Sequence, residues 1–167
     1  SGSFDFNNGN LTSGPLAANW FGQPVSLNFS TQETKKDYKV NINLNGNWAL
    51  AKLPWLPDSI KPKLSGNASW KSAVDITLPP KGTAKYDVAF SGDLKSVSSR
   101  LPAPLNKSAG TSLPIKLEAN GGLNGFRMNG SFAGNQDIDS QWAFGKNGTK
   151  LSRLTWTANN AKTPELP

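Results

Sequence analysis

Apolar and polar residues alternate with a period of two along most of this chain. The pattern is clearest over residues 38–45, which read Tyr-Lys-Val-Asn-Ile-Asn-Leu-Asn. Because successive side chains of a β-strand point to opposite faces, this alternation predicts a strand with one apolar face and one wet face. The same pattern predicts further strands at residues 25–29, 84–90, 113–119, 126–129, 142–144 and 154–156.

Short clusters of Asn and Gly separate these segments, at residues 7–10, 45–47, 121–122, 134–135 and 146–148. Both residue types tolerate positive φ, so the clusters predict turns that reverse the chain between antiparallel strands. The predicted fold class is therefore an all-β antiparallel meander. Its apolar face is either the core of a closed sandwich or the lining of an open trough, and periodicity alone does not choose between them.

Two stretches interrupt the alternation. Residues 48–63 predict either an apolar loop or one short helical turn ended by Pro54. Residues 101–114, with Pro102, Pro104 and Pro114, predict a proline-fixed extended loop. We expect residues 1–160 to form one all-β segment and residues 161–167 to be a frayed tail.

The beginning of the chain gives no targeting signal. Residues 1–6, Ser-Gly-Ser-Phe-Asp-Phe, open directly on the alternating pattern, without the basic and apolar regions of a signal peptide. No apolar run approaches the roughly 18–20 residues that span a bilayer. We therefore expect an excised segment of a longer protein.

Two residue types are missing altogether, since the chain contains neither Cys nor His. Their absence excludes Ser-His-Asp and Cys-His nucleophiles and every imidazole or thiolate metal ligand. Asp137 and Asp139 share one strand face and would hold calcium only weakly, because no further oxygen ligand is near in the sequence. We interpret the acids as structural or solvated and expect no enzyme activity, no cofactor and no metal.

The net charge is +7, from 18 Lys and Arg against 11 Asp and Glu. The basic residues are scattered, which is typical of a mildly basic solvated face. Nucleic-acid binding requires aromatic and basic residues on one face, whereas here they alternate onto opposite faces. The sequence therefore argues against a nucleic-acid partner.

Six tryptophans are many for 167 residues. Trp142 and Trp156 keep phase with Phe144 and Leu154, which favours a place in the apolar interior. Trp55 lies between Pro54 and the following Leu-Pro pair and is the tryptophan we most expect to be exposed.

Residues 92–107, Gly-Asp-Leu-Lys-Ser-Val-Ser-Ser-Arg-Leu-Pro-Ala-Pro-Leu-Asn-Lys, are followed by Ser-Leu-Pro-Ile at 112–115. This succession resembles a recurring element of the YhdP family, large AsmA-like proteins of Gram-negative envelopes. The flanking strands punctuated by Asn and Gly are similar to the middle region of these proteins, so the resemblance covers most of the chain.

The resemblance implies a segment of a curled, open β-sheet groove, with at most one short helical turn, in a bridge-like lipid-transport protein. Such a protein is periplasmic, anchored in the inner membrane by a segment absent here, and carries phospholipid toward the outer membrane. The implied partners are phospholipid acyl chains, with envelope proteins at either end of the full-length protein, and the family implies no catalytic residues. From the alternation phase, the expected groove lining is Val40, Ile42, Leu44, Tyr86, Val88, Phe90, Ile115, Leu117, Trp142, Phe144, Leu154 and Trp156.

Two alternatives stay open at the level of sequence. One is a β-sandwich module that binds glycan with Trp20 and Trp55 as platforms. The other is a structural scaffold that contacts partner proteins through its sheet edges. The first requires a closed core.

Overall fold

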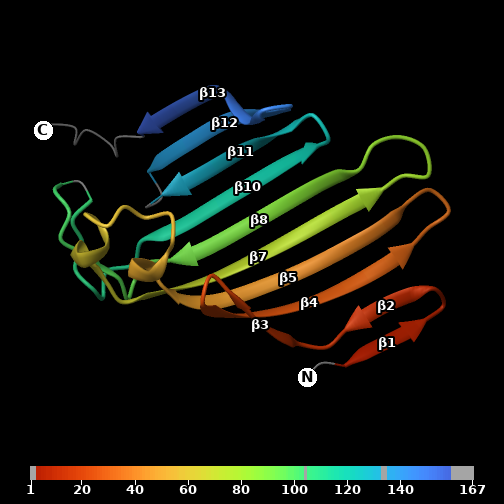
Figure 1. The fold of residues 1–167 in the computed structure, drawn as a ribbon, viewed down its shortest axis with the longest axis horizontal. Coiled ribbons are helices and arrows are strands. Elements are labelled where there is room, and N and C mark those ends of the chain that lie inside the picture. The colour runs from red at the N-terminus through yellow and green to blue at the C-terminus, as the bar shows by residue number, and fades with distance from the viewer. Residues whose placement is uncertain (1–2, 104, 133–134, 159–167) are drawn as a thin grey trace, which may run out of the picture.

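A computed structural model describes residues 3–103, 105–132 and 135–158. It confirms the all-β antiparallel meander (Figure 1). The predicted frayed tail, residues 161–167, lies outside the described residues.

Eleven strands form one antiparallel sheet in the order β1-β2-β4-β5-β7-β8-β10-β11-β12-β13, with β3 paired to β4. Their bounds are β1 Phe4–Asn7, β2 Asn10–Ser13, β3 Leu16–Trp20, β4 Gln23–Glu33, β5 Tyr38–Ala49, β7 Asn67–Leu78, β8 Lys85–Asp93, β10 Pro114–Gly122, β11 Gly125–Phe132, β12 Gln136–Gly145 and β13 Gly148–Ala158. A small second sheet joins β6 (Leu64–Ser65) to β9 (Ser98–Ser99).

The two ends of the strands differ in their connections. At one end, called the turn end, short connections at residues 34–37, 79–84, 123–124 and 146–147 join neighbouring strands. At the opposite end, called the loop end, two long connections at 50–66 and 94–113 join β5 to β7 and β8 to β10. Figure 1 shows the long connections gathered at the left and short turns at the right.

The two long connections fold against each other as a small lobe. The ribbon of β6 and β9 joins them, and Arg100 donates from its backbone N–H to Lys63 and from its guanidinium to Pro62. Val97 lies inside the lobe and is only 2% exposed. Single 3₁₀ turns, η1 (Leu50–Lys52) and η2 (Lys61–Lys63), occupy the stretch where the sequence predicted at most one helical turn.

The turn predicted at residues 45–47 is wrong, because these residues lie inside β5. A Cβ on Gly46 would meet the indole of Trp70 at 2.8–2.9 Å. Glycine is required there for close approach of a side chain from β7, and not for a chain reversal. By contrast, the cluster at 7–10 does form a hairpin turn, with positive φ at both Asn8 (50°) and Gly9 (78°).

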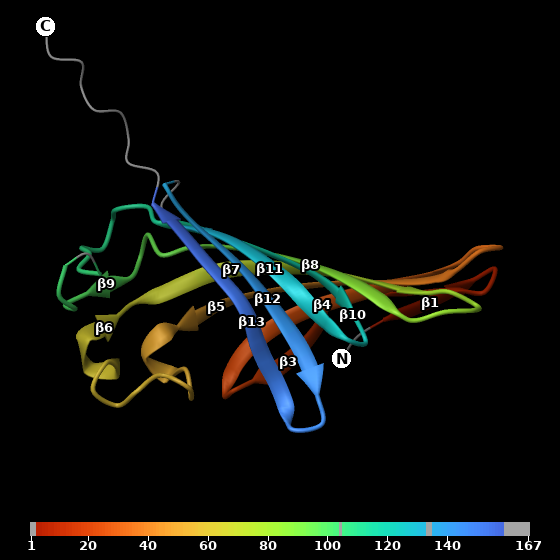
Figure 2. The ribbon, with the colours of Figure 1, turned by 90° about the horizontal axis from the view of Figure 1, so that it is seen from above.

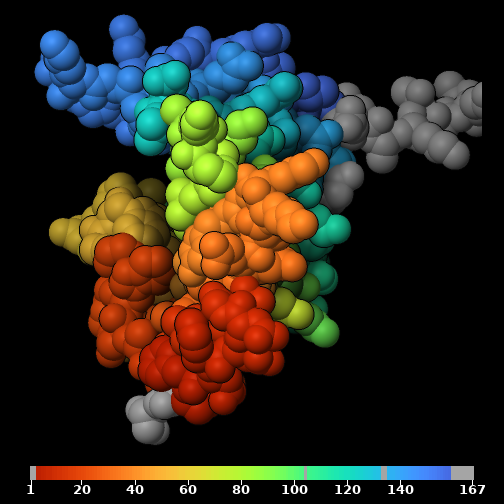
Figure 3. Space-filling model, turned by 90° about the vertical axis from the view of Figure 1, so that its right-hand side faces the viewer, coloured from red at the N-terminus to blue at the C-terminus, as the bar shows by residue number. Residues whose placement is uncertain are grey.

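The large sheet is a single twisted layer that does not close into a barrel. Figure 2 shows β12 and β13 crossing the direction of β4 and β5, as expected from the twist of a many-stranded sheet. In Figure 3 the blue strands at the top and the gold segment near residues 50–63 project to the same side. In the described part of the chain only Val25, Trp48, Ala68 and Val97 are buried apolar residues. The closed core that a β-sandwich requires is therefore absent from the described residues, so that alternative is not favoured.

Candidate functional site

The strand register assembles an apolar row that runs across the sheet. Ile42 pairs with Val74, and Val74 pairs with Val88. The row continues in both directions through the pairs that join Phe29, Ile42, Val74, Val88, Ala119, Met128, Ser140 and Leu154. Ser140, which is only 1% exposed, is its one polar member. Eight strands at about 4.8 Å spacing make this row about 34 Å long.

All twelve residues of the expected lining lie on the same face as this row. The residues at i±2 along a strand share its face, which places Val40 and Leu44 with Ile42 and places Tyr86 and Phe90 with Val88. Leu117 is paired with Phe90, and Ile115 lies two residues before it. Trp142 and Phe144 follow Ser140 at the same spacing in β12.

β13 contains a bulge, and the bulge affects which of its side chains lie on the apolar face. Gln141 pairs with Arg153 while Trp142 pairs with Leu151, so Ser152 is an extra residue in β13. This bulge keeps Leu151 and Leu154 on the apolar face together, because the odd spacing between them is absorbed at Ser152. Leu154 and Trp156 therefore share a face with Trp142.

Most of the face is half-buried and not enclosed. Nine of the twelve expected residues are half-buried, whereas Phe144 is 43%, Leu154 58% and Trp156 67% exposed. The expectation that Trp156 lies in an apolar interior is wrong, because β13 is the edge strand and no described element covers it. Trp55, expected to be exposed, is 60% exposed.

Sequence reasoning missed β7 and its contribution to this face. Val74 and Ile76 lie between the β5 and β8 members, paired with Val88 and Tyr86. Residues 68–78 do alternate, but the inward position 72 is a serine, which weakens the apolar signal. Met128 and Ile138 were also absent from the expected lining. Met128 lies in the predicted strand 126–129 and pairs with Ala119, whereas Ile138 lies in a part of β12 that the alternation did not predict and pairs with Gly130.

A chain of aromatic contacts crosses the apolar face near the loop end. The ring centroids of Phe21 and Trp55 are 5.1 Å apart, and those of Phe21 and Trp48 are 6.3 Å apart. Trp48 lies 4.9 Å from Trp70, which in turn lies 5.9 Å from Phe90. Because Trp55 belongs to the 50–66 connection, these contacts lean that connection over the apolar face. The apolar face is thus the side toward which the lobe projects.

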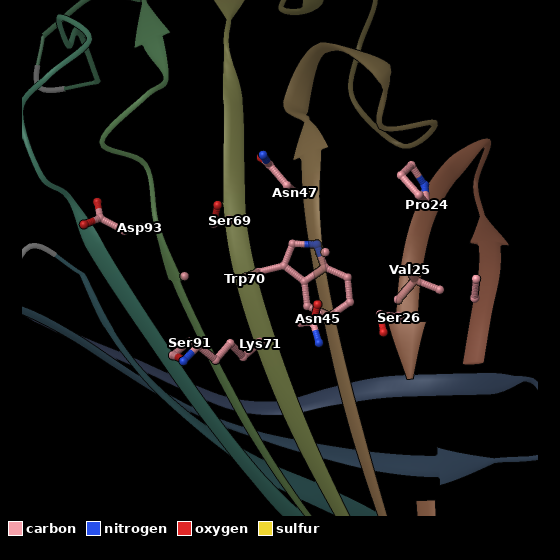
Figure 4. Close-up of a pocket in the computed structure, with 13 residues that line it drawn as sticks. Pro24, Val25, Ser26, Asn45, Asn47, Ser69, Trp70, Lys71, Ser91 and Asp93 are labelled. Atoms are coloured by element: carbon pink, nitrogen blue, oxygen red, sulfur yellow. The ribbon is translucent and has the colours of Figure 1, made fainter. Parts of the chain in front are cut away.

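The opposite face is polar and contains a hollow over four strands. Ser26, Asn45, Lys71 and Ser91 are successive cross-strand neighbours on this face. They help to line a depression of about 960 Å³ over β4, β5, β7 and β8 (Figure 4). Its side chains are mostly short and neutral, and the described residues contain no group of three or more acids that would hold a metal ion. We therefore place the candidate site on the apolar face, despite the size of this hollow.

Two acids on the polar face, Asp139 and Asp93, accept hydrogen bonds from neighbouring residues. The Asp139 carboxylate accepts hydrogen bonds from the Arg127 guanidinium, 3.0 Å from its Nε. At the end of β8, Asp93 accepts from the Ser112 hydroxyl at 2.6 Å and from the Leu113 backbone N–H at 2.9 Å. These two bonds, chiefly the one from Ser112, lower the pKa of Asp93 below its ordinary value. Asp93 thereby fastens β10 to β8 at the loop end.

Within the described residues, the large sheet is a single antiparallel layer with one polar face and one largely apolar face, which defines an open, amphipathic β-sheet protein. The described residues include no helix long and apolar enough to cross a membrane. The family model described as "YhdP protein" matches residues 1–167. The chain belongs to the YhdP family.

One relative extends this assignment. The chain is 43% identical over all 167 residues to the "Intermembrane phospholipid transporter YhdP" of Escherichia coli (strain K12). The aligned region is 13% of that protein, so the chain spans about one eighth of its length. No solved structure gave a significant match.

Proposed function

We propose that this chain is a segment of a periplasmic hydrophobic groove that carries phospholipids between the inner and outer membranes. The observation that supports it best is the row of mainly apolar residues across eight strands, which no second sheet covers in the part of the chain that the structure describes. The name of the Escherichia coli relative supports the choice of phospholipid as cargo. The full-length protein would be anchored in the inner membrane and would meet envelope proteins at its two ends.

The chemistry of the face suits a conduit. Each buried methylene contributes about 0.8 kcal/mol wherever it lies on apolar surface. A tail that advances by one position along the row therefore exchanges one apolar contact for another, and no position on the row carries a charge that would trap it. Val40, Ile42, Leu44, Tyr86, Val88, Phe90, Ile115, Leu117, Trp142, Phe144, Leu154 and Trp156 are the proposed acyl-chain contacts. On this proposal the segment acts by shielding tails and has no catalytic residue.

Site-specific photo-crosslinking tests the proposal. A photoreactive residue is placed at Ile42, Val88 or Phe144 in the longer protein, expressed in the envelope. The adjacent positions Asn43, Asp87 and Ala143 point to the opposite face and serve as matched controls. We expect lipid adducts at the first three positions and none at the controls. Adducts at neither set, or equally at both, would overturn the proposal, and protein adducts at the apolar positions would favour the scaffold alternative.

A further inference from the structure

The charge of this chain is divided between the strands and their connections. The strands of the large sheet carry 7 Lys and Arg against 8 Asp and Glu, a net charge of −1. The remaining described residues carry 10 Lys and Arg against 2 acids, a net charge of +8. The net positive charge of the described residues therefore comes from the segments at the two ends of the strands.

These ends are the two edges between which the apolar face lies, and we call them the lips. The turn-end lip carries Lys35, Lys36, Lys81 and Lys146 against Asp37. The loop-end lip carries Lys52, Lys61, Lys63, Lys95, Arg100 and Lys107 against Asp58. Since the outer polar face has both signs in near balance, it would not attract anions in the same way.

The contacts of the lip cations show which of them are free to meet a ligand. At the loop end, Lys61 pairs with Asp58 at 2.9 Å, and Arg100 and Lys107 donate to backbone carbonyls. Within the described residues, the ammonium groups of the four turn-end lysines make no side-chain hydrogen bond or ion pair, and all four side chains are exposed. An ammonium without a carboxylate partner keeps its full attraction for an external anion within about 8 Å at physiological ionic strength.

We infer that the groove prefers anionic phospholipids over zwitterionic ones, with the lip lysines meeting the head groups. This inference rests on the proposed function. Tails on the apolar face leave the head group to reach water past one of the lips, where the local net charge is +3 or +5. A phosphatidylglycerol head group carries a net negative charge there, whereas a phosphatidylcholine head group is neutral overall. A basic lip therefore stabilises the first more than the second.

Short-chain lipids provide a test in which no membrane surface is present. The 167-residue chain is titrated with dioctanoyl phosphatidylglycerol or dioctanoyl phosphatidylcholine, each below its critical micelle concentration, and binding is measured by calorimetry. We expect tighter binding of phosphatidylglycerol, by roughly fivefold for each lysine that a head group contacts, and a preference that shrinks as salt is raised.

Two variants that lose the same amount of positive charge test whether the preference depends on the lip lysines or on the overall charge of the chain. In the lip variant, Lys35, Lys36, Lys81 and Lys146 are replaced by Gln; in the control, Lys39, Lys71, Lys116 and Arg153 of the outer face are replaced. Circular dichroism checks that both retain the sheet. We expect the lip variant to lose the part of the preference that the turn-end lysines supply, and the control variant to keep the wild-type preference.

The outcomes separate the head-group preference from the proposed function. Binding of both lipids with equal affinity would overturn the inference and leave the proposed function standing. An equal loss of preference in both variants would also overturn the inference, because the lip lysines would then contribute no more than the outer-face cations. Binding of neither lipid would overturn the proposed function itself.

Discussion

Asp93 shows how a single carboxylate joins a strand to a long connection. It lies at the last position of β8 and accepts hydrogen bonds from Ser112 and Leu113, the two residues that precede β10. The ionised form is the better acceptor, and this is why its pKa is lowered.

The lowered pKa predicts the direction of a pH effect on stability. A carboxyl whose pKa is lower in the folded state stabilises the fold fully above its unfolded-state pKa, and that contribution is lost as the pH falls through the folded-state pKa. The reference pKa is 3.8, so the loss belongs below about pH 4. We expect Asp93→Asn to lower the melting temperature at pH 7, and we expect this deficit to shrink as the pH is lowered below 3.8. Thermal unfolding followed by circular dichroism checks this, with Asp87→Asn as control. A deficit of Asp93→Asn that persists unchanged at low pH would contradict it.

Gly46 illustrates what residue types can and cannot indicate. In the sequence, Asn-Gly-Asn looks like a turn, because such residues favour positive φ. In the structure Gly46 is extended within β5 and gives room to the Trp70 indole. The local sequence does not contain this reason, since Trp70 comes from β7, 24 positions later.

The lobe at the loop end was predicted from the sequence only as loops, and the structure shows which contacts hold it together. Lys107, the last residue of the Leu-Pro-Ala-Pro-Leu-Asn-Lys motif, donates from its ammonium to the backbone carbonyls of Val97 at 2.9 Å and Ser108 at 3.0 Å. Its backbone also exchanges hydrogen bonds with Ser99. The motif that carried the family resemblance thus holds the 94–113 connection closed.

These contacts predict that replacing Lys107 loosens the lobe while the sheet persists. In Lys107→Met, the stem of the side chain remains but the three carbonyl contacts of the ammonium are lost, including the part-buried contact to the Val97 carbonyl. We expect faster amide hydrogen exchange in residues 95–109, about tenfold if 1–2 kcal/mol of local stability is lost. Exchange in β5 and β7 should stay unchanged. Lys95→Met, with an exposed side chain, is the control, and unaltered exchange in Lys107→Met would contradict the assigned role.

The strands themselves were largely predictable, because each alternates between a polar face and an apolar face. Seven predicted segments fall within β4, β5, β8, β10, β11, β12 and β13 or extend at most one residue beyond them. β7 escaped because Ser72 occupies an inward position, and β3 because residues 16–20, Leu-Ala-Ala-Asn-Trp, do not alternate. Which strands are neighbours, and hence which side chains form the row, depends on pairing between distant segments and is not contained in any one of them.

At the scale of the molecule, the uncovered sheet makes one face available to a ligand and keeps the other in water. Val88 lies at the centre of the apolar row, and Ala89 lies next to it on the opposite face, where it is exposed. This pair offers a matched comparison between the two faces within one strand.

We expect Val88→Asp to abolish most lipid binding and Ala89→Asp to leave it unchanged. A carboxylate in the row must lose water when a tail lies over it, whereas the same group on the outer face stays hydrated. The measurement is phospholipid per chain in organic extracts of the purified proteins, counted by mass spectrometry. Equal lipid content in the two variants would contradict the assignment of the faces, provided that circular dichroism shows both to be folded.

In a sheet whose apolar side chains are mainly half-buried, the free energy of unfolding also depends on temperature in an unusual way. The heat capacity of unfolding grows with the apolar surface that unfolding newly exposes, about 12–15 cal/mol/K per residue in ordinary globular domains. Here much of that surface is already hydrated in the folded state, so the heat capacity change is smaller and the stability curve is flatter. Acyl chains lying on the face would remove that water and serve as the second layer that the polypeptide lacks. Cargo and fold would then stabilise each other, and a filled groove would melt at a higher temperature, and with a larger heat capacity change, than an empty one.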